Sequence, residues 1–331
     1  MLLDKVIEGL RRKGVTFDCD VPMSIKTWIH RGPVVPLYVV PKNPDELEYT
    51  VRLLFHSGLR YKLVGHTSNI YMLPSYRIDS IISTAKMTGY QVADGLLTCE
   101  AGVSMSRLAS CLVEDGYEGF EGFVNLPGTV GAAIVNNASC YGCIASSNMV
   151  SASILRYDGN TIIKENVKPE FFEFSHRSSS IKSGKEHAVI LGISFKLNKT
   201  LNKEALKKKA EWNKWHRKTF QEGKANNLGS IFSARAPKRF ALKYIHKYKY
   251  PLLLLLKLAD RYLSGTIWYS HNRSHLYLYL YGFSDIREYV SKHDDNCFLW
   301  KDDNADKAFV RYLEFMNTSC VCGPMEIEIC K

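Results

Sequence analysis

The sequence predicts a mixed α and β protein built from two or three packed units. Its 331 residues, 46% of them hydrophobic, exceed what one small core needs. Segments with strand and helix patterns alternate through the first two hundred residues. After about Leu197 the composition changes to Lys-, Tyr- and Leu-rich sequence, which we interpret as a boundary between units.

Local patterns place the elements in chain order. Residues 36–41 predict a strand, and residues 44–58 predict a helix with Pro44 and two acids in its first turn and Gly58 at its end. Another helix is expected at 104–116 and a third over 203–218. Further strands are expected at 61–65, 77–84, 96–102, 152–159, 161–165 and 187–198. Alternating leucines and tyrosines predict a strand over 276–282 as well.

From the sequence we expect a cytoplasmic protein without a membrane span. No stretch approaches the roughly 20 apolar residues that a membrane helix needs. The longest aliphatic run, Leu252 to Leu256, lies between Pro251 and Lys257 and is interpreted as core. Asp4 and Glu8 interrupt the apolar stretch that a signal peptide would need. Nine cysteines, an odd number in a long chain, favour reduced thiols over a disulfide framework.

The positive charge is concentrated in one segment. Residues Lys199 to Tyr250 hold 15 Lys and Arg against 3 Glu, a net +12, compared with +11 for the whole chain. The segment is either a surface for a polyanion or phosphorylated ligand or a solvated helix, and Arg217 and Lys218 remain candidates for ligand contact. Interleaved aromatic residues would let a nucleic-acid-binding protein stack bases here: Trp212, Trp215, Tyr244, Tyr248 and Tyr250.

Two loops carry candidate binding chemistry. The first leaves the strand at 61–65 and consists of Gly65, His66, Thr67, Ser68 and Asn69. A glycine lets an anion approach closely, and backbone N–H groups and hydroxyls can donate to phosphate oxygens. Any strand can end in such a turn, so this loop alone is a weak signal.

The second loop lies within Leu126 to Gly142. Pro127 and Gly128 set a turn, Thr129 supplies a hydroxyl, and Gly131, Ala132 and Ala133 keep the surface bare. A planar cofactor or a pyrophosphate could lie there, with the amides of Asn136 and Asn137 nearby, although a tight structural crossing would use the same residues. The stretch is not the G-x-G-x-x-G fingerprint of a Rossmann fold.

Cysteine and histidine spacing does not predict a metal site. Cys140 and Cys143 form one close pair, and Cys320 and Cys322 form another. No second pair at a recognisable spacing accompanies either of them, and His271, His275 and His293 are irregularly spaced. We interpret the cysteines as ordinary thiols.

The motifs, taken in order, resemble the UDP-N-acetylenolpyruvoylglucosamine reductase family of peptidoglycan precursor synthesis. The resemblance spans most of the chain, through residues 21–34, 65–69, 126–142, 172–182, 216–232, 290–296 and 325–329. Several residues depart from the family pattern: Arg31, Ala132, Ser139, Cys140, His176, Ser233, Ala234 and Arg235. The last three replace lysine, asparagine and proline. Because of these three replacements, the resemblance predicts flavin binding more firmly than it predicts the identity of the substrate.

The resemblance implies an α+β fold with a two-lobed FAD-binding module of the vanillyl-alcohol-oxidase/PCMH type and a smaller C-terminal substrate domain. The implied boundaries are 1–86 and 87–200 for the lobes and 201–331 for the third domain, with the last strand returning to the first lobe. The implied cofactor is non-covalent FAD, held by Gly65 to Asn69, Leu126 to Thr129, Gly131, Ala132 and Asn136. NADPH is the implied hydride donor, and the expected protein is a monomer.

The resemblance also implies a reaction and its residues. Reduced flavin would deliver hydride to the enolpyruvyl group of a nucleotide-sugar substrate, UDP-N-acetylglucosamine enolpyruvate. Ser230 would donate the proton, while Arg177 and Glu328 would polarise the carboxylate and stabilise the enolate. Arg217, Gln221 and His293 would contact the substrate. One alternative is a flavin oxidoreductase acting on another anionic substrate; a nucleic-acid-binding protein is another, but it leaves the loop motifs unexplained.

Overall fold

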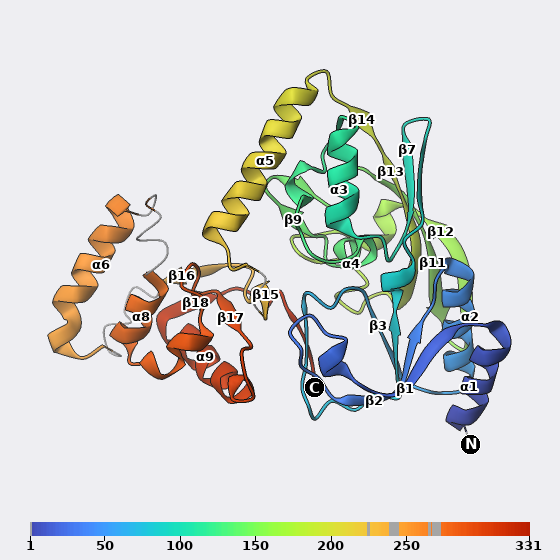
Figure 1. Cartoon of the computed structure of the whole chain (residues 1–331), viewed down its shortest axis with the longest axis horizontal. Coiled ribbons are helices and arrows are strands. Elements are labelled where there is room, and N and C mark those ends of the chain that lie inside the picture. Colours follow the sequence, from blue (N-terminus) through green and yellow to red (C-terminus); the bar gives the residue numbers. More distant parts are fainter. Residues whose placement is uncertain (1, 224–225, 238–244, 264–265, 267–272) are drawn as a thin grey trace.

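A computed structural model describes residues 2–223, 226–237, 245–263, 266 and 273–331. Two β-sheets with their helices form one part of the molecule, and a mostly helical C-terminal part lies beside them (Figure 1). Tyr244 and His271 lie outside the described residues. Within the described ranges, no helix is both long and apolar enough to cross a bilayer.

The first sheet has four strands in the order β1-β2-β5-β3, and α1 and α2 pack on it. Strand β1 pairs with β2 in antiparallel fashion, whereas β2, β5 and β3 run parallel. The bounds are α1 Leu2–Lys13, β1 Thr16–Pro22, β2 Val34–Val40, α2 Pro44–His56, β3 Tyr61–Val64 and β5 Ser80–Ser83. The predicted strands at 36–41 and 61–65 and the predicted helix at 44–58 are confirmed. Helix α2 begins where Asn43 accepts a hydrogen bond from Glu46 N at 2.9 Å.

The second sheet has five antiparallel strands in the order β12-β11-β13-β7-β6. Their bounds are β6 Tyr90–Ala93, β7 Leu96–Glu100, β11 Met149–Asp158, β12 Thr161–Val167 and β13 Ala188–Lys196. Neighbouring apolar residues point to opposite faces: Ile154 packs with the core around α3, and Leu155 packs with the core around α2. The centre of the sheet, at β11 and β13, is therefore buried on both faces, which explains the continuous apolar run in β13.

Short elements complete the N-terminal two hundred residues. Helix α3 (Met105–Glu114) was predicted at 104–116 and is capped at its N-terminus by Ser104. Helix α4 (Val130–Val135) is capped by Thr129. The short strands are β4 Ile70–Met72, β8 Tyr117–Glu118, β9 Ser139–Cys140, β10 Cys143–Ile144 and β14 Asn198–Lys199. The 3-10 turns are η1 Met23–Ile25, η2 Thr84–Lys86, η3 Glu121–Phe123 and η4 Pro169–Phe172.

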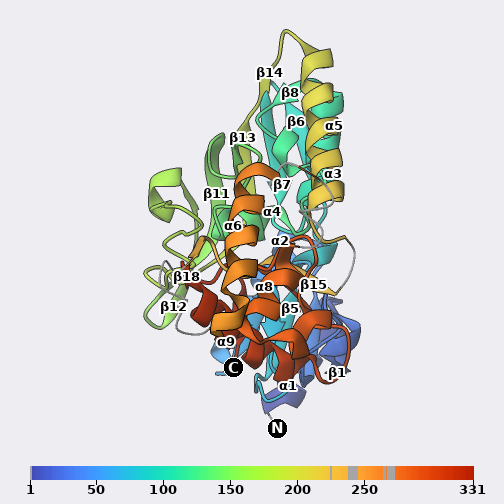
Figure 2. The same cartoon turned by 90° about the vertical axis from the view of Figure 1, so that its left-hand side faces the viewer.

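Helix α5 (Lys203–Phe220) connects the two parts and runs beside α3 (Figure 2). It contains the predicted helix at 203–218. Lys207 and Lys209 of its basic face pair with Glu114 and Glu121, at 2.7 Å and 2.8 Å. Two lysines of the basic segment therefore attach helix α5 to α3 and η3.

The C-terminal part is mainly helical around an aromatic core. Its elements are β15 Asn227–Ser230, β16 Arg235–Pro237, η6 Lys247–Lys249, α6 Tyr250–Leu263, α8 Arg273–Tyr281, η7 Ser284–Tyr289, β17 Cys297–Leu299, α9 Ala305–Ser319 and β18 Cys320–Cys322. Buried Phe298, Trp300 and Tyr312 pack in a cluster that also contains Ile29 and Tyr71 from the N-terminal part. The two parts thus share one core.

One sequence prediction in this part is wrong, and another is correct only in part. Residues 276–282, predicted as a strand, lie mostly in helix α8, which ends before Gly282 at φ +81°. An uninterrupted apolar run can bury one face of a helix as well as of a strand, and Leu278 and Leu280 are buried here. The run Leu252–Leu256, predicted as core, buries Leu253 and Leu256 but leaves Leu254 and Leu255 each 62% exposed. One side of α6 faces outward.

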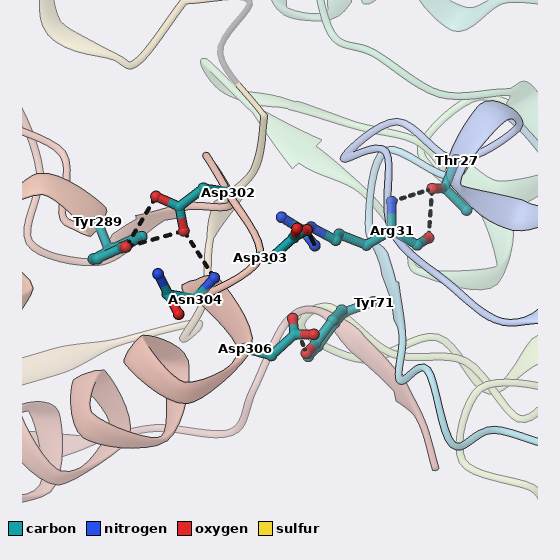
Figure 3. A network of polar contacts seen from close by, with 8 residues as sticks. All are labelled: Thr27, Arg31, Tyr71, Tyr289, Asp302, Asp303, Asn304 and Asp306. Atoms are coloured by element: carbon teal, nitrogen blue, oxygen red, sulfur yellow. Dashed lines mark hydrogen bonds and ion pairs between the residues drawn. The ribbon is translucent and has the colours of Figure 1, made fainter.

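Polar contacts also join the two parts (Figure 3). Tyr71 donates a hydrogen bond to Asp306 at 2.6 Å, and Arg31 pairs with Asp303 at 2.8 Å. The Arg31 backbone is held in place by Thr27, whose hydroxyl accepts from its N–H and donates to its carbonyl. Strand β19 (Glu328–Cys330) then returns to the N-terminal part and pairs in parallel with β4.

Candidate active site

The two glycine-containing loops lie against each other beyond the end of β3. A Cβ atom on Gly65 would lie 2.4 Å from Thr129 Oγ1, so no larger residue fits there without displacing the second loop. Gly128 has φ +117°, which favours glycine, and its missing side chain faces Ser68. The result is a surface made of backbone and small side chains.

The first loop is fastened on both sides. Thr67 has φ 56°; its Oγ1 accepts a hydrogen bond from Trp28 N at 2.8 Å and donates to His66 O at 2.7 Å. Burial lowers the pKa of His66, so its imidazole is neutral at pH 7. Asn69 donates its amide to Glu326 O at 2.9 Å and accepts from Glu328 N at 2.9 Å. Asn69 therefore binds the C-terminal segment.

The second loop leads into α4, whose first turn is bonded within the protein. Val130 N donates to Val103 O, and Gly131 N donates to Ala101 O, each at 2.9 Å. A Cβ on Gly131 would lie 2.9 Å from the Cβ of Ala101. A bound anion would therefore meet the loop groups before Thr129 rather than the first-turn amides of the helix.

The other predicted residues of this stretch have varied surroundings. Thr129 accepts from Ala132 N at 3.4 Å and caps α4, and Asn136 closes the same helix by donating to Ala132 O at 2.9 Å. Pro127 is exposed, whereas Leu126 is partly buried against the core of the second sheet. The polar side chains of Thr129 and Asn136 are therefore bonded within the protein, and they shape the loop.

Arg177 lies in a tight turn that faces the C-terminal segment. Its φ is 57°, a left-handed conformation that is unusual for arginine. Its Nε pairs with Glu326 Oε1 at 3.0 Å, and Lys182 donates to its carbonyl at 3.1 Å. The turn is fastened to the glycine-rich stretch, because Asn137 donates to Ser175 O at 2.8 Å and Ser179 donates to Val135 O at 2.6 Å.

Glu328 pairs with Lys62 on β3. Burial acts to lower the pKa of Lys62, but the Glu328 carboxylate outweighs burial and raises it. Glu326 and Glu328 are two residues apart, on either side of a bend at Ile327. One short segment therefore carries both partners, one for Arg177 and one for Lys62.

Ser230 ends β15 and is exposed. The next residue, Ile231, accepts a hydrogen bond from Glu326 N at 2.8 Å and donates to Asn296 O at 2.8 Å. The Asn296 side chain also bonds both backbone groups of Phe232, at 3.0 Å and 2.8 Å. These bonds hold the Ser230 strand against the C-terminal segment.

Arg177 therefore contacts the segment 326–328 directly, Glu328 belongs to that segment, and Ser230 precedes the residue, Ile231, that bonds to it. Sequence reasoning missed the partners Glu326, Lys62 and Asn296. Glu326 could have been found, because it alternates with Glu328 in the same short motif. Asn296 ends the motif at 290–296 but was assigned no role there, and Lys62 carries no local signal because its partner is distant in sequence.

The predicted substrate residues fall into two places. Arg217, near the end of α5, donates to Gln221 Oε1 at 3.2 Å and to Cys140 Sγ at 2.7 Å, and it stacks over the Tyr141 ring at 5.4 Å. Its Nε is buried and has no hydrogen-bond partner among the described residues. His293 lies between η7 and β17, where its N–H donates to Ser291. Arg217 and Gln221 are thus brought together.

The cysteines and acidic groups form no metal centre in the part of the chain that the structure describes. All nine cysteines are free thiols. Cys140 and Cys143 face each other across the β9–β10 turn.

Comparison with known proteins identifies similar enzymes. Residues 35–163 match a family described as an FAD binding domain. The chain is 31% identical over 243 residues to the UDP-N-acetylenolpyruvoylglucosamine reductase of Caldicellulosiruptor saccharolyticus, covering 73% of this chain and 76% of that protein. It is 30% identical over 195 residues to the reductase of the same name from Fervidobacterium nodosum, covering 59% of this chain and 62% of that protein.

A solved structure has the same fold. The crystal structure of the UDP-N-acetylenolpyruvylglucosamine reductase of Thermus caldophilus aligns with a TM-score of 0.63 and 15% identity, covering 96% of this chain and 99% of that one. The alignment extends over the N-terminal sheets and the C-terminal part alike.

Proposed function

The chain belongs to the UDP-N-acetylenolpyruvoylglucosamine reductase family and is an FAD-dependent oxidoreductase, and we propose that it uses NADPH to reduce UDP-N-acetylglucosamine enolpyruvate to UDP-N-acetylmuramate. The expected α+β fold with an FAD-binding module is confirmed. One observation supports the proposal: the segment 326–328 contains Glu328, pairs with Arg177 and bonds to Ile231 next to Ser230, and Asn69 ties it to the first glycine loop.

The loops fit FAD. A Cβ at Gly65 would push the two loops apart, Gly128 has a φ that favours glycine, and His66 is a neutral ring beside them. When bound, FAD supplies the two-electron carrier between NADPH and the substrate. The proposed contacts are backbone groups of Gly65 to Ser68 and of Pro127 to Thr129, because the side chains of Asn69 and Asn136 are already engaged.

Arg177 is proposed to bind the substrate carboxylate. Addition of hydride to the enolpyruvyl group places negative charge on the resulting enolate, which needs cationic stabilisation. A guanidinium has five N–H donors in a planar fork, and Glu326 forms an ion pair at the Nε side of Arg177. The two terminal nitrogens then match a carboxylate in bidentate fashion, with Glu326 fixing the plane of the guanidinium.

Glu328 is proposed to act together with Lys62. A lone carboxylate would repel an enolate, whereas the Lys62–Glu328 pair is neutral overall and can turn its ammonium toward the developing charge. Ser230 is the proposed proton donor. A serine is a weak acid in water, so this role depends on the bound substrate covering the exposed hydroxyl and on nearby cations that stabilise its alkoxide.

Arg217 and Gln221 are proposed to bind the anionic part of the nucleotide sugar, with His293 further along the same substrate domain. The unpartnered Arg217 Nε supports this assignment. We propose the domain division 1–86, 87–200 and 201–331, with β19 returning to the first lobe. The pairing of β19 with β4 supports that division.

Ser233 and Ala234 favour a second candidate function. They stand where the family has lysine and asparagine, so an ammonium and an amide donor are missing after the Ser230 strand. A related reductase acting on a different nucleotide-sugar or anionic acceptor would have this pattern.

The test is product formation by the purified, yellow protein. With NADPH and UDP-N-acetylglucosamine enolpyruvate, we expect NADPH oxidation that requires the substrate and a product two hydrogens heavier by mass spectrometry. A protein that takes up no FAD would refute the proposal. FAD uptake and reduction by NADPH without this product, but with turnover of another anionic enol ether, would favour the second candidate.

A further inference from the structure

The β9–β10 hairpin places two cysteines directly opposite each other. Cys140 pairs with Cys143 in the antiparallel register. The two turn residues, Tyr141 and Gly142, have φ 45° and φ 83°, as a tight two-residue hairpin turn requires. Opposite residues in such a pair have Cα atoms about 4.5–5.5 Å apart and side chains on one face, which is within reach of a disulfide.

The two thiols differ in accessibility. Cys140 is partly buried, and its Sγ receives a hydrogen bond from Arg217 Nη2 at 2.7 Å. Cys143 is only 6% exposed, and its Sγ accepts from Gly122 N at 3.3 Å. A reagent from solution would therefore meet Cys140 first, and Cys143 would be the thiol that resolves the product.

We propose that Cys140 and Cys143 form a reversible dithiol–disulfide pair that reacts with low-molecular-weight disulfides, and that its oxidation releases Arg217. Arg217 holds Cys140 on one side and Gln221 on the other. A sulfur bonded to Cys143 would no longer accept from the guanidinium. The effect on substrate binding rests on the proposed function, in which Arg217 contacts the nucleotide sugar.

Neither thiol of the pair is stabilised as a thiolate. Burial raises the pKa of Cys140 against the opposing effect of Arg217 and Arg177, and burial raises the pKa of Cys143 to about 11. In a strongly oxidising pair, stabilisation of a thiolate stabilises the reduced form. A pair without a stabilised thiolate has no such preference for the reduced form. The same high pKa values make the first attack slow at neutral pH.

The exchange is balanced in two steps. The Cys140 thiol loses its proton to solvent, and the thiolate attacks one sulfur of the small disulfide, whose S–S bond breaks to release one thiol. The Cys143 thiol then loses its proton and attacks the Cys140 sulfur of the mixed disulfide, releasing the second thiol. The two cysteines lose two electrons and two protons, and the small disulfide gains them.

The chemical test uses FAD-loaded protein and glutathione disulfide. A tryptic peptide from Leu108 to Arg156 contains Cys140, Cys143 and Cys111, so the C111S variant leaves the pair alone in that peptide. We expect this peptide to become two hydrogens lighter and resistant to alkylation, and dithiothreitol to reverse both changes. The C143S variant in the same background should stop with glutathione attached to Cys140. A peptide that keeps two alkylatable thiols would overturn the proposal.

The kinetic test compares oxidised and reduced C111S protein. Oxidation should raise KM for the nucleotide sugar about tenfold, the effect of losing one well-placed charged contact, while flavin reduction by NADPH is unchanged. A disulfide that forms without changing KM would refute the link to Arg217. A disulfide that forms in a protein with no activity on any nucleotide sugar would instead count against the proposed function.

Discussion

The glycine loops and the substrate side of the site are built by different means. At the loops, Gly65 meets Thr129 so closely that the backbone positions themselves define the surface. On the substrate side, long charged side chains are held by partners from distant parts of the chain, such as Arg177 by Glu326. A surface made of backbone depends on a few glycine positions that do not tolerate substitution. In a set of ion pairs, by contrast, one partner can be substituted at a time.

The largest effect that separates the two regions should come from Ser230→Ala. If Ser230 donates the proton, substrate should reoxidise the reduced flavin about 10²–10⁴-fold more slowly, while NADPH reduces the flavin at an unchanged rate. Stopped-flow absorbance of the two half-reactions measures both. Ser233→Ala removes a neighbouring hydroxyl and is the matched control. Equal slowing of both half-reactions would show that Ser230 acts on the cofactor side.

Gly65→Ala should weaken flavin binding rather than slow one half-reaction. The new methyl group would lie 2.4 Å from Thr129 Oγ1, so the loops must separate, at a cost of about 1–3 kcal/mol in unfolding free energy. We expect a lower urea midpoint and a lower ratio of flavin to protein absorbance. Gly223→Ala is the control, because no described atom lies within 4 Å of its added Cβ. Full flavin occupancy in Gly65→Ala would mean that the loop contact does not shape the cofactor site.

The difference between the regions also decides what the sequence could predict. Glycines and hydroxyls at the two loops are local signals, and the structure brings those loops together. Lys62 and Glu328 are separated by 266 residues, and Cys140 and Arg217 by 77, so no local pattern could pair them. The strand expected at 276–282 failed because leucines and tyrosines are both apolar enough to be buried in a helix, so their alternation does not exclude one, and the surrounding aromatic core decided in favour of a helix.

On the substrate side, Glu326→Gln should have a moderate effect. The pair with Arg177 is partly exposed, so we expect about a fivefold loss of kcat/KM, or about 1 kcal/mol, with flavin content unchanged. Steady-state NADPH oxidation at varied substrate concentration measures it. Glu165→Gln breaks the Arg156–Glu165 pair on the second sheet and should leave kcat/KM unaltered. An effect of equal size in both variants would remove the special role of Glu326.

The smallest effects concern how the C-terminal part is held (Figure 3). Tyr71 is 1% exposed and bonds Asp306, so Tyr71→Phe should lower the unfolding free energy by about 1 kcal/mol. Asp303 is fully exposed, so Asp303→Asn should leave the urea midpoint unchanged although it also joins the two parts. If Asp303→Asn were the more damaging change, the buried contact would not be the one that fastens the domain.

The most direct test of the account is anaerobic reoxidation of the NADPH-reduced holoenzyme by UDP-N-acetylglucosamine enolpyruvate. The account predicts that the flavin absorbance near 450 nm returns in proportion to the substrate added, with one flavin reoxidised for each substrate molecule reduced. A reduced flavin that remains bleached with this substrate, yet is reoxidised by another nucleotide-sugar or anionic acceptor, would contradict it.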